Sequence, residues 1–362
     1  MKNWDDVVAK AYSEELDQLT YAAHLISQEA RAGMCGCVAS LKGTIKNLLC
    51  EEEEIIYVDN ANRFAPLRYQ RLARLAGAAS LSKSQLENEL ACSRVDSANP
   101  APSQDSFVHV VLPYRIILFA QPEAVLSLAC STQGLERMRM LLGERVPVLS
   151  YAPAGFALAK ACQQAVEKQG AANIEGIYID HQGLLVFGET ARMAYERLVE
   201  IETAVEKTLR EQDAWELSFP VGETTGKSIG HELAALRKSV SNVAGFPLIL
   251  THFMDEELAG LCAGGMLDRL AQGLPVAGDA GILKVLPMVG RDVEAYREAL
   301  KHLAGEYESA DVENMPDSAP RTVLDTEFGL CSLGRTAAQA LLAQKRFLQV
   351  RDIVLRAGAL GG

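Results

Sequence analysis

Apolar residues recur at two different spacings along this chain, and the spacing separates helices from strands. In residues 4–33 they recur at helical spacing, which predicts one long N-terminal helix. Residues 55–58 form a short β-branched and aromatic run closed by turn-forming residues, which is typical of a strand. Further helices are expected at 69–79, 82–92, 123–130, 156–168 and 190–211, with a short one from Ser106 that Pro113 ends. Further strands are expected at 114–119 and 146–150, and 176–180 with 183–187 should form a hairpin.

A second series of elements begins after the polar stretch 219–228. Helices are expected at 231–243, 255–272, 292–307 and 336–357, and strands at 247–252, 281–287 and 321–325. Alternating strands and helices are typical of an α/β fold, so we expect this class in both halves. A chain of 362 residues is too long for one average domain, and we place the domains at 1–216 and 229–362. No internal repeat is evident in the sequence.

Composition narrows the class of protein. A hydrophobic content of 49% with 23% charged residues indicates an ordinary core-forming soluble protein. The net charge of −12 argues against nucleic acid or an anionic membrane as a partner, since both require clustered Lys and Arg. The most apolar stretch, near 110–120, is too short to span a bilayer, and the N-terminus shows no signal peptide. We therefore expect a cytoplasmic protein. The acidic run Glu51–Glu54 should be a solvated turn or helix end.

The eight cysteines do not form a recognisable metal-binding or disulfide pattern. Only Cys35 and Cys37 are close together, and no second pair stands at zinc-ribbon spacing. In a reducing compartment most of the cysteines should be small buried apolar residues. A structural or redox role for Cys35 and Cys37 is a minor alternative, because paired thiolates suit soft metals.

Several segments of the chain together carry a family resemblance. They are Trp4-Asp5-Asp6, Phe64–Arg68, Tyr151–Lys160, Phe187–Arg192 with Tyr195–Arg197, and Leu333–Thr336. With these segments the chain resembles the class II aldolase/adducin family. It is more closely similar to the aldolase portion of bifunctional rhamnulose-1-phosphate aldolase/short-chain dehydrogenase proteins. The resemblance implies a three-layer α/β/α domain followed by a smaller α/β domain.

The resemblance also implies a metal site, and this chain departs from it. Such aldolases hold a divalent metal, usually zinc, with three histidines, and the metal polarises the carbonyl of a ketose phosphate. The three ligand positions fall here at Phe119, Gln121 and Gln182. A phenyl ring and two amides cannot replace imidazole ligands, so we expect no metal cofactor. His181 stands one residue early, and the alternation of a hairpin should point it to the other face.

Other family positions are only partly retained. A carboxylate that acts as acid or base lies four residues before a histidine in the family, and these residues here are Asp105 and His109. That spacing would place both on one face of a helix. The phosphate cradle of the family corresponds to Ser40 and Lys42, and its second phosphate turn corresponds to Asp59–Asn62, which contains Asn60 and Asn62. A carboxylate in that turn would repel a phosphate.

Simpler interpretations stand beside these roles. His109, in an apolar segment, could be a hydrogen-bonded core histidine, and Asp105 could cap the helix that begins at Ser106. His181 could be an exposed residue at a hairpin tip. A relocated metal site built from Asp105, His109 and His181 is a further alternative. Gln121 and Gln182 could instead hydrogen-bond a neutral sugar or carboxamide ligand.

Three functions therefore remain open. The first is a metal-free aldolase homologue that binds a sugar-like ligand or another protein, as the resemblance to adducins implies. The second is an active sugar-phosphate lyase with a rebuilt site. The third is a different enzyme that uses Asp105 and His109 as acid and base. The resemblance further implies a homo-oligomer, and a dehydrogenase could act as a separately encoded partner.

Overall fold

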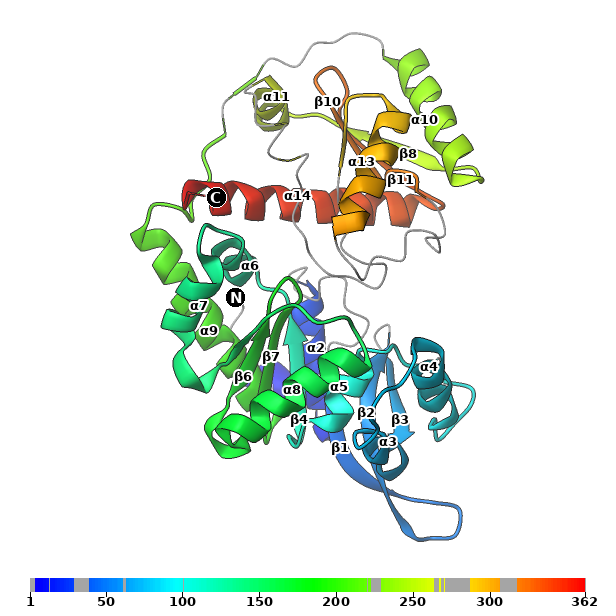
Figure 1. The fold of residues 1–362 in the computed structure, drawn as a ribbon, viewed down its shortest axis with the longest axis vertical. Coiled ribbons are helices and arrows are strands. Elements are labelled where there is room, and N and C mark those ends of the chain that lie inside the picture. The colour runs from blue at the N-terminus through cyan, green and yellow to red at the C-terminus, as the bar shows by residue number, and fades with distance from the viewer. Residues whose placement is uncertain are drawn as a thin grey trace. The chain divides into compact units, whose positions relative to one another are not determined.

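The computed structural model describes residues 4–12, 14–28, 39–60, 63–99, 101–219, 221–222, 229–263, 267, 270, 287–306 and 318–361 (Figure 1). The chain forms two compact units. The first comprises residues 1–129 and 133–209, and the second comprises 130–132 and 210–362. Among the described residues no helix is long and apolar enough to cross a membrane.

A seven-stranded sheet of order β3-β2-β1-β4-β7-β6-β5 forms the first unit. Its strands are β1 (Ala39–Lys46), β2 (Glu52–Asn60), β3 (Arg63–Arg68), β4 (Ile116–Ala120), β5 (Val148–Leu149), β6 (Gly176–Ile179) and β7 (Gly183–Gly188). All neighbours pair antiparallel except β5 and β6, which are parallel. β4 and β7 are buried along their whole length, because both lie in the middle of the sheet and are covered on both faces.

Helices cover both faces of this sheet. They are α1 (Asp6–Ala9), α2 (Glu15–Gln28), α3 (Tyr69–Leu75), α4 (Lys83–Cys92), α5 (Ser106–Val111), α6 (Glu123–Ala129), α7 (Gly134–Leu142), α8 (Phe156–Gln169) and α9 (Ala191–Glu211), with short 3₁₀ turns at Gly143–Arg145 and Ala171–Asn173. On one face, α3, α4, α5 and α8 share an apolar core with alternate residues of the strands. α2 packs against β1 on the other face, behind the strands in Figure 1. The first unit is therefore the expected three-layer α/β/α domain.

The N-terminal segment is not the single long helix that its pattern predicts. α1 and α2 are separate, and the aromatic rings explain the break. The ring of Trp4 lies 5.0 Å from that of Tyr21, and Tyr12 stacks on the same ring at 5.4 Å. A continuous helix would separate Trp4 and Tyr21 by about 25 Å at 1.5 Å per residue. Burying three aromatic rings together outweighs the continuity of the helix.

Two strands of the first unit were not expected, and the acidic run Glu51–Glu54 does not form the predicted turn or helix end. β1 and β3 lie where the pattern predicted no element, and β2 extends beyond residues 55–58 at both ends. The acidic run is part of β2, where Glu52, Glu53 and Glu54 pair with Lys46, Ile45 and Thr44 of β1. It is neither a turn nor a helix end, although these glutamates are mostly exposed to solvent as expected.

The second unit contains a four-stranded sheet of order β8-β11-β10-β9. Its strands are β8 (Ile249–Phe253), β9 (Met288–Val289), β10 (Thr322–Asp325) and β11 (Gly329–Gly334), and its helices are α10 (Gly230–Ala244), α11 (Glu256–Ala263), α13 (Val293–Glu306) and α14 (Ala337–Ala359). On one face α10 and α13 pack on Val323 and Cys331, and on the other α11 and α14 pack on Leu324 and Leu330. Alternate residues of the hairpin thus supply two cores, which makes this unit α/β as well.

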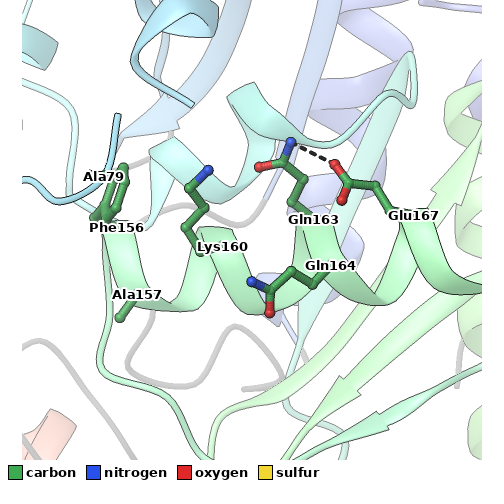
Figure 2. A pocket seen from close by; sticks show the side chains of 7 residues that line it. All are labelled: Ala79, Phe156, Ala157, Lys160, Gln163, Gln164 and Glu167. Atoms are coloured by element: carbon green, nitrogen blue, oxygen red, sulfur yellow. Dashed lines mark hydrogen bonds between the residues drawn. The ribbon is translucent and has the colours of Figure 1, made fainter. Parts of the chain in front are cut away.

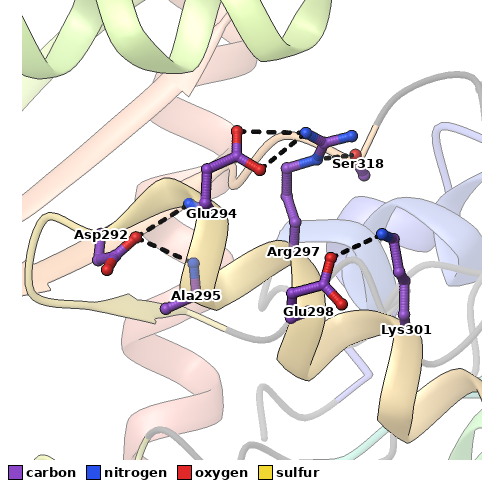
Figure 3. Close-up of polar contacts among 7 residues, drawn as sticks. All are labelled: Asp292, Glu294, Ala295, Arg297, Glu298, Lys301 and Ser318. Atoms are coloured by element: carbon purple, nitrogen blue, oxygen red, sulfur yellow. Dashed lines mark hydrogen bonds and ion pairs between the residues drawn. The ribbon is translucent and has the colours of Figure 1, made fainter.

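Hydrogen bonds of its own side chains fix the start of α13 (Figure 3). The carboxylate of Asp292 accepts hydrogen bonds from the backbone amides of Glu294 and Ala295 at 3.1 and 2.9 Å. Arg297 binds Glu294 and donates to the hydroxyl of Ser318 at 3.1 Å. The bonds to Asp292 satisfy the first amides of the helix, as an acidic N-cap does.

Most other elements lie where the pattern predicts them, with ends shifted by a few residues. The β6–β7 hairpin and the helices α3 to α6, α8 to α11, α13 and α14 confirm their predictions. β11 was not expected, and the predicted strand at 281–287 falls almost wholly outside the described residues. Cys162, Cys262 and Cys331 are buried as expected, but Cys50 and Cys92 are exposed. Cys35 and Cys37 also lie outside the described part of the chain.

Candidate functional site

β1 and α5 bring Ser40 and His109 together inside the first unit. Ser40 faces the α5 side of the sheet because it pairs with Ile117 of β4, whose side chain belongs to that core. The hydroxyl of Ser40 lies 2.9 Å from Nδ1 of His109 in a buried hydrogen bond. Both side chains are enclosed, with 0% and 2% of their surface exposed. The prediction of a hydrogen-bonded core histidine is confirmed.

Burial decides the charge of this histidine. Desolvation, with a smaller contribution from the nearby charge of Lys42, lowers the pKa of His109 to about 3. The imidazole is therefore neutral at physiological pH and cannot donate a proton as an imidazolium acid. In this neutral form it holds the hydroxyl of Ser40 and is a weak base.

Asp105 does not cap α5. It occupies the N-cap position with helical dihedral angles, and its side chain makes no capping hydrogen bond. That part of the sequence interpretation was wrong, because a capping side chain requires an extended N-cap residue. Lys42 is the charged residue that acts on the pKa of His109. Asp105 precedes the helix that carries His109, and Nδ1 of His109 is hydrogen-bonded to Ser40.

Lys42 lies two residues after Ser40, on the same side of β1. Its ammonium donates a hydrogen bond to the backbone carbonyl of Leu112 and lies 4.9 Å from the centre of the Tyr69 ring. Desolvation lowers the pKa of Lys42 to about 8, and desolvation with the charge of Glu54 raises the pKa of Tyr69. The ammonium is thus held by a backbone carbonyl and an aromatic face. Tyr69 is a neighbour that the sequence did not reveal.

Phe119 occupies the first of the three metal-ligand positions, and it belongs to the apolar core. It is 6% exposed and packs among the residues that β4 shares with α5 and α8. Its ring closely approaches the backbone of β7: a Cβ atom on Gly183 would lie 2.8 Å from the tip of the ring and 2.6 Å from the carbonyl oxygen of Ala120. Only a glycine fits at this point, and its φ of +141° also excludes other residues.

The two glutamines at the remaining ligand positions are joined to the backbone. The side-chain amide of Gln121 donates to the carbonyl of Gln182, and the side-chain amide of Gln182 donates to the carbonyl of Ala152. Both are buried, with 3% and 7% of their surface exposed. Together with Phe119 they form packed structure at the end of β4 and β7. These residues do not fit a divalent metal, since they offer it no imidazole, thiolate or carboxylate.

His181 is held in the turn between β6 and β7. Its φ of 58° is left-handed, and Nε2 lies 3.4 Å from the carboxylate of Asp180. Its side chain is 27% exposed, and Nδ1 is buried without a hydrogen-bond partner. Burial raises the pKa of Asp180, while His181 and Arg139 oppose that rise. His181 is thus half-buried, and Asp180 is a neighbour that its position in the sequence could have suggested.

The hydrogen bonds of the expected site residues fall into two sets. Ser40, Lys42 and His109 form one group, and Phe119, Gln121 and Gln182 form another. Asn60 ends β2, but its side chain and all of Asn62 lie outside the described residues. Among the described residues, no three His, Cys, Asp or Glu side chains converge as a metal site would require.

A surface hollow of about 420 Å³ lies elsewhere on the first unit (Figure 2). It follows α8 and is lined by Ala79, Phe156, Ala157, Lys160, Gln163, Gln164 and Glu167. The amide of Gln163 donates to Glu167 at 3.0 Å, and the ammonium of Lys160 donates to the carbonyl of Ala76. None of the residues expected at the family's active site lines this hollow.

Comparison with known proteins finds a family match over most of the first unit. Residues 66–209 match the family model of the class II aldolase and adducin N-terminal domain. The solved N-terminal class II aldolase domain of a conserved protein from Thermoplasma acidophilum is 27% identical, with a TM-score of 0.52. The match covers 58% of this chain and all of that domain. A sugar-phosphate aldolase from Thermotoga maritima is 12% identical with a TM-score of 0.40, covering 56% of this chain and 98% of that one.

One curated relative extends beyond this chain. It is named an uncharacterized oxidoreductase, YuxG, from Bacillus subtilis (strain 168), and it is 21% identical over 99% of this chain. The chain spans only about half of that relative, 56% of its length.

Proposed function

Starting from a chain that carries a class II aldolase-type domain, we propose that this domain binds a small ligand or another protein without metal-dependent aldol chemistry. The observation that carries the proposal is the packing at the three ligand positions. Phe119 is part of the core, and the amides of Gln121 and Gln182 are bonded to backbone carbonyls. Replacing three ligands by side chains that stabilise the fold removes the Lewis acid on which the family's reaction depends.

The ligand that these residues favour is a small sugar-like molecule with a hydroxyl or anionic group. Lys42 supplies the charge, because a pKa of about 8 leaves most of its amine protonated at pH 7. Ser40 lies on the same side of β1, and its hydroxyl is oriented by the neutral imidazole of His109. Because that hydroxyl is enclosed, the ammonium of Lys42 is the group that can hold a polar oxygen of a ligand without a metal.

Binding can be tested with ketoses and ketose 1-phosphates by titration calorimetry. We expect Lys42→Met to weaken binding about tenfold or more, because it keeps the alkyl stem and removes the charge. Lys46→Met is the matched control, since Lys46 is an exposed lysine on the same strand. Equal affinity of the two variants, or retro-aldol turnover of a ketose 1-phosphate that depends on added zinc, would contradict the proposal. The second outcome would favour a lyase with a rebuilt site.

A second candidate is an acid–base enzyme without a metal, and the pKa of Lys42 favours it. An amine with a pKa of about 8 can act as a base near neutral pH, whereas His109 with a pKa of about 3 is a poor one. This acid–base function is tested by measuring, in heavy water, exchange of the proton next to a ketose carbonyl. This function requires exchange that increases with pH through about 8 and is lost in Lys42→Met. No exchange above the rate in buffer would exclude it.

A dehydrogenase partner is the remaining part of the proposal. The curated relative is named an oxidoreductase, and this chain corresponds to 56% of its length. We propose that a dehydrogenase acts together with this chain. Co-purification of a dehydrogenase with the full chain from its native source would support this, and its absence from repeated purifications would contradict it.

A further inference from the structure

The second unit repeats the topology of the first. In the first unit the strands β4-β7-β6-β5 are neighbours in this order, and in the second unit the order is β8-β11-β10-β9. The pairings also agree. β4–β7 and β8–β11 are antiparallel, β6–β7 and β10–β11 are antiparallel hairpins, and β5–β6 and β9–β10 are parallel.

The registers of the paired strands coincide as well. Ile116 pairs with Gly188 at the end of β7, and Ile249 pairs with Gly334 at the end of β11. Each hairpin closes on a glycine with positive φ, Gly183 in one and Gly329 in the other. Each second strand ends in Gly-x-Thr-Ala, at residues 188–191 and 334–337. Such agreement in register and closing residues is expected of two versions of one unit.

The helices follow the same order. α5 precedes β4 as α10 precedes β8, α8 joins β5 to β6 as α13 joins β9 to β10, and α9 follows β7 as α14 follows β11. A Cβ atom on Gly188 would meet the backbone nitrogen of Ala194 at 2.7 Å, and on Gly334 that of Ala340 at 2.5 Å. Residues 106–211 and 230–359 are therefore two repeats of one α/β arrangement.

The two repeats differ in what covers them. In the first, β1 pairs with the outer edge of β4, and Ile116 is 1% exposed. Trp4 lies 6.0 Å from the ring of Tyr195, which is 0% exposed. The N-terminal elements thus bury one strand edge and the neighbouring helix face of the first repeat.

In the second repeat the equivalent surface is open among the described residues. Ile249 takes the place of Ile116 and is 42% exposed, and Leu341 takes the place of Tyr195 and is 51% exposed. β8 is the edge strand of its sheet, and no described strand pairs with its outer side. An edge strand with an exposed apolar residue such as Ile249 is a surface for adding another strand.

We propose that the outer edge of β8 pairs with the β8 edge of a second chain of this protein, antiparallel across a two-fold axis. The first repeat defines the position, because β1 is antiparallel to β4 and covers Ile116–Leu118, which corresponds to Ile249–Thr251. An antiparallel pairing centred on Leu250 places Leu250 opposite itself. It places Asp255 opposite Gly245, so like charges are kept apart. A two-fold axis makes one apolar strip complementary to itself, which favours a second chain over an unrelated partner.

The test is the mass of the full chain by sedimentation velocity over a wide range of concentration. We expect the wild-type chain to be a dimer, or a multiple of it. The pair of substitutions Ile249→Glu and Leu341→Glu should weaken this association by about 100-fold or more, because it buries four unpaired carboxylates in each interface. Met140→Glu is the matched control, since Met140 is 75% exposed on α7 of the first unit.

A second measurement does not depend on added charge. Leu250→Cys should form a disulfide-linked dimer on mild oxidation, since directly opposed residues of antiparallel strands lie within disulfide distance. The parent chain with its native cysteines, oxidised in the same way, is the control. A wild-type monomer at all concentrations would overturn the proposal. An unchanged mass in the double variant, or the absence of cross-linking in Leu250→Cys beyond the parent, would do the same.

Discussion

At the residue scale, the enclosed histidine shows how burial decides chemistry. His109 has the residue type and spacing of a catalytic partner, and the structure gives it a hydroxyl of Ser40 and complete burial. The same burial lowers its pKa to about 3, so that it serves structure better than proton transfer.

This pKa makes stability depend on pH. Between pH 3 and 6.5 the unfolded chain binds a proton at this histidine and the folded chain does not. The folded state therefore loses stability as the pH falls below 6.5. The loss should reach about 1.4 kcal/mol per pH unit. Urea unfolding across this range should show a smaller slope in His109→Asn, which keeps a group for Ser40. Imidazole resonances of His109 that titrate between pH 5 and 8 would contradict this.

A second prediction at the residue scale concerns Gly183. Gly183→Ala places a methyl group 2.6 Å from the carbonyl oxygen of Ala120 at a φ of +141°, so we expect a loss of about 3 kcal/mol or more in unfolding free energy. Gly43→Ala is the control, because nothing lies within 4 Å of its added atom. Thermal unfolding should separate the two variants clearly. A loss in Gly43→Ala equal to that in Gly183→Ala would show that the close approach is not the cause.

The sequence shows which residue types stand at the candidate positions, but not which contacts they make. Substitution at Phe119, Gln121 and Gln182 is visible in the sequence, because residue type alone excludes imidazole ligands. Their bonds to backbone carbonyls are not visible, since these depend on where β4 and the β6–β7 turn meet in space. Tyr69 could not be found, because it reaches Lys42 from a different element.

At the scale of elements, periodicity predicted helices well and strands less well. Helices such as α9 carry a long apolar face that repeats over several turns. Such a helix is recognised from the sequence even when its ends are placed a few residues wrongly. β1 has a Gly43 and alternates weakly, and β3 contains Pro66, so neither resembles a strand by itself. Both strands are stabilised by pairing with β2, although their own residues have a low preference for strands.

Helix α4 offers a test of a local signal. The hydroxyl of Ser82 accepts from the amide of Gln85 at 3.2 Å, and the Gln85 side chain accepts from the amide of Ser82 at 2.9 Å. We expect Ser82→Ala to cost about 1 kcal/mol of unfolding free energy by removing this cap. Ser80→Ala, in the exposed loop before the helix, should be close to neutral. Equal effects of the two substitutions in chemical denaturation would contradict the role of the cap.

At the scale of the whole molecule, the chain has one unit with a seven-stranded sheet and one with a four-stranded sheet. The second repeats part of the topology of the first. The sequence did not reveal this repeat, because little more than Gly-x-Thr-Ala and the hairpin glycines is shared. What the two units share is strand order and register, which depend on hydrogen bonds between distant segments. Only the structure can show a likeness of that kind.

The central proposal is that the class II aldolase-type domain binds no metal. The most direct test is the metal content of the full chain, purified without chelators or a metal-affinity column and then incubated with zinc, manganese or cobalt. We expect no ion to remain bound after gel filtration, because Phe119, Gln121 and Gln182 offer none of the ligands that hold one. One tightly held ion per chain would contradict the account, and Asp105, His109 and His181 would then be the first residues to replace.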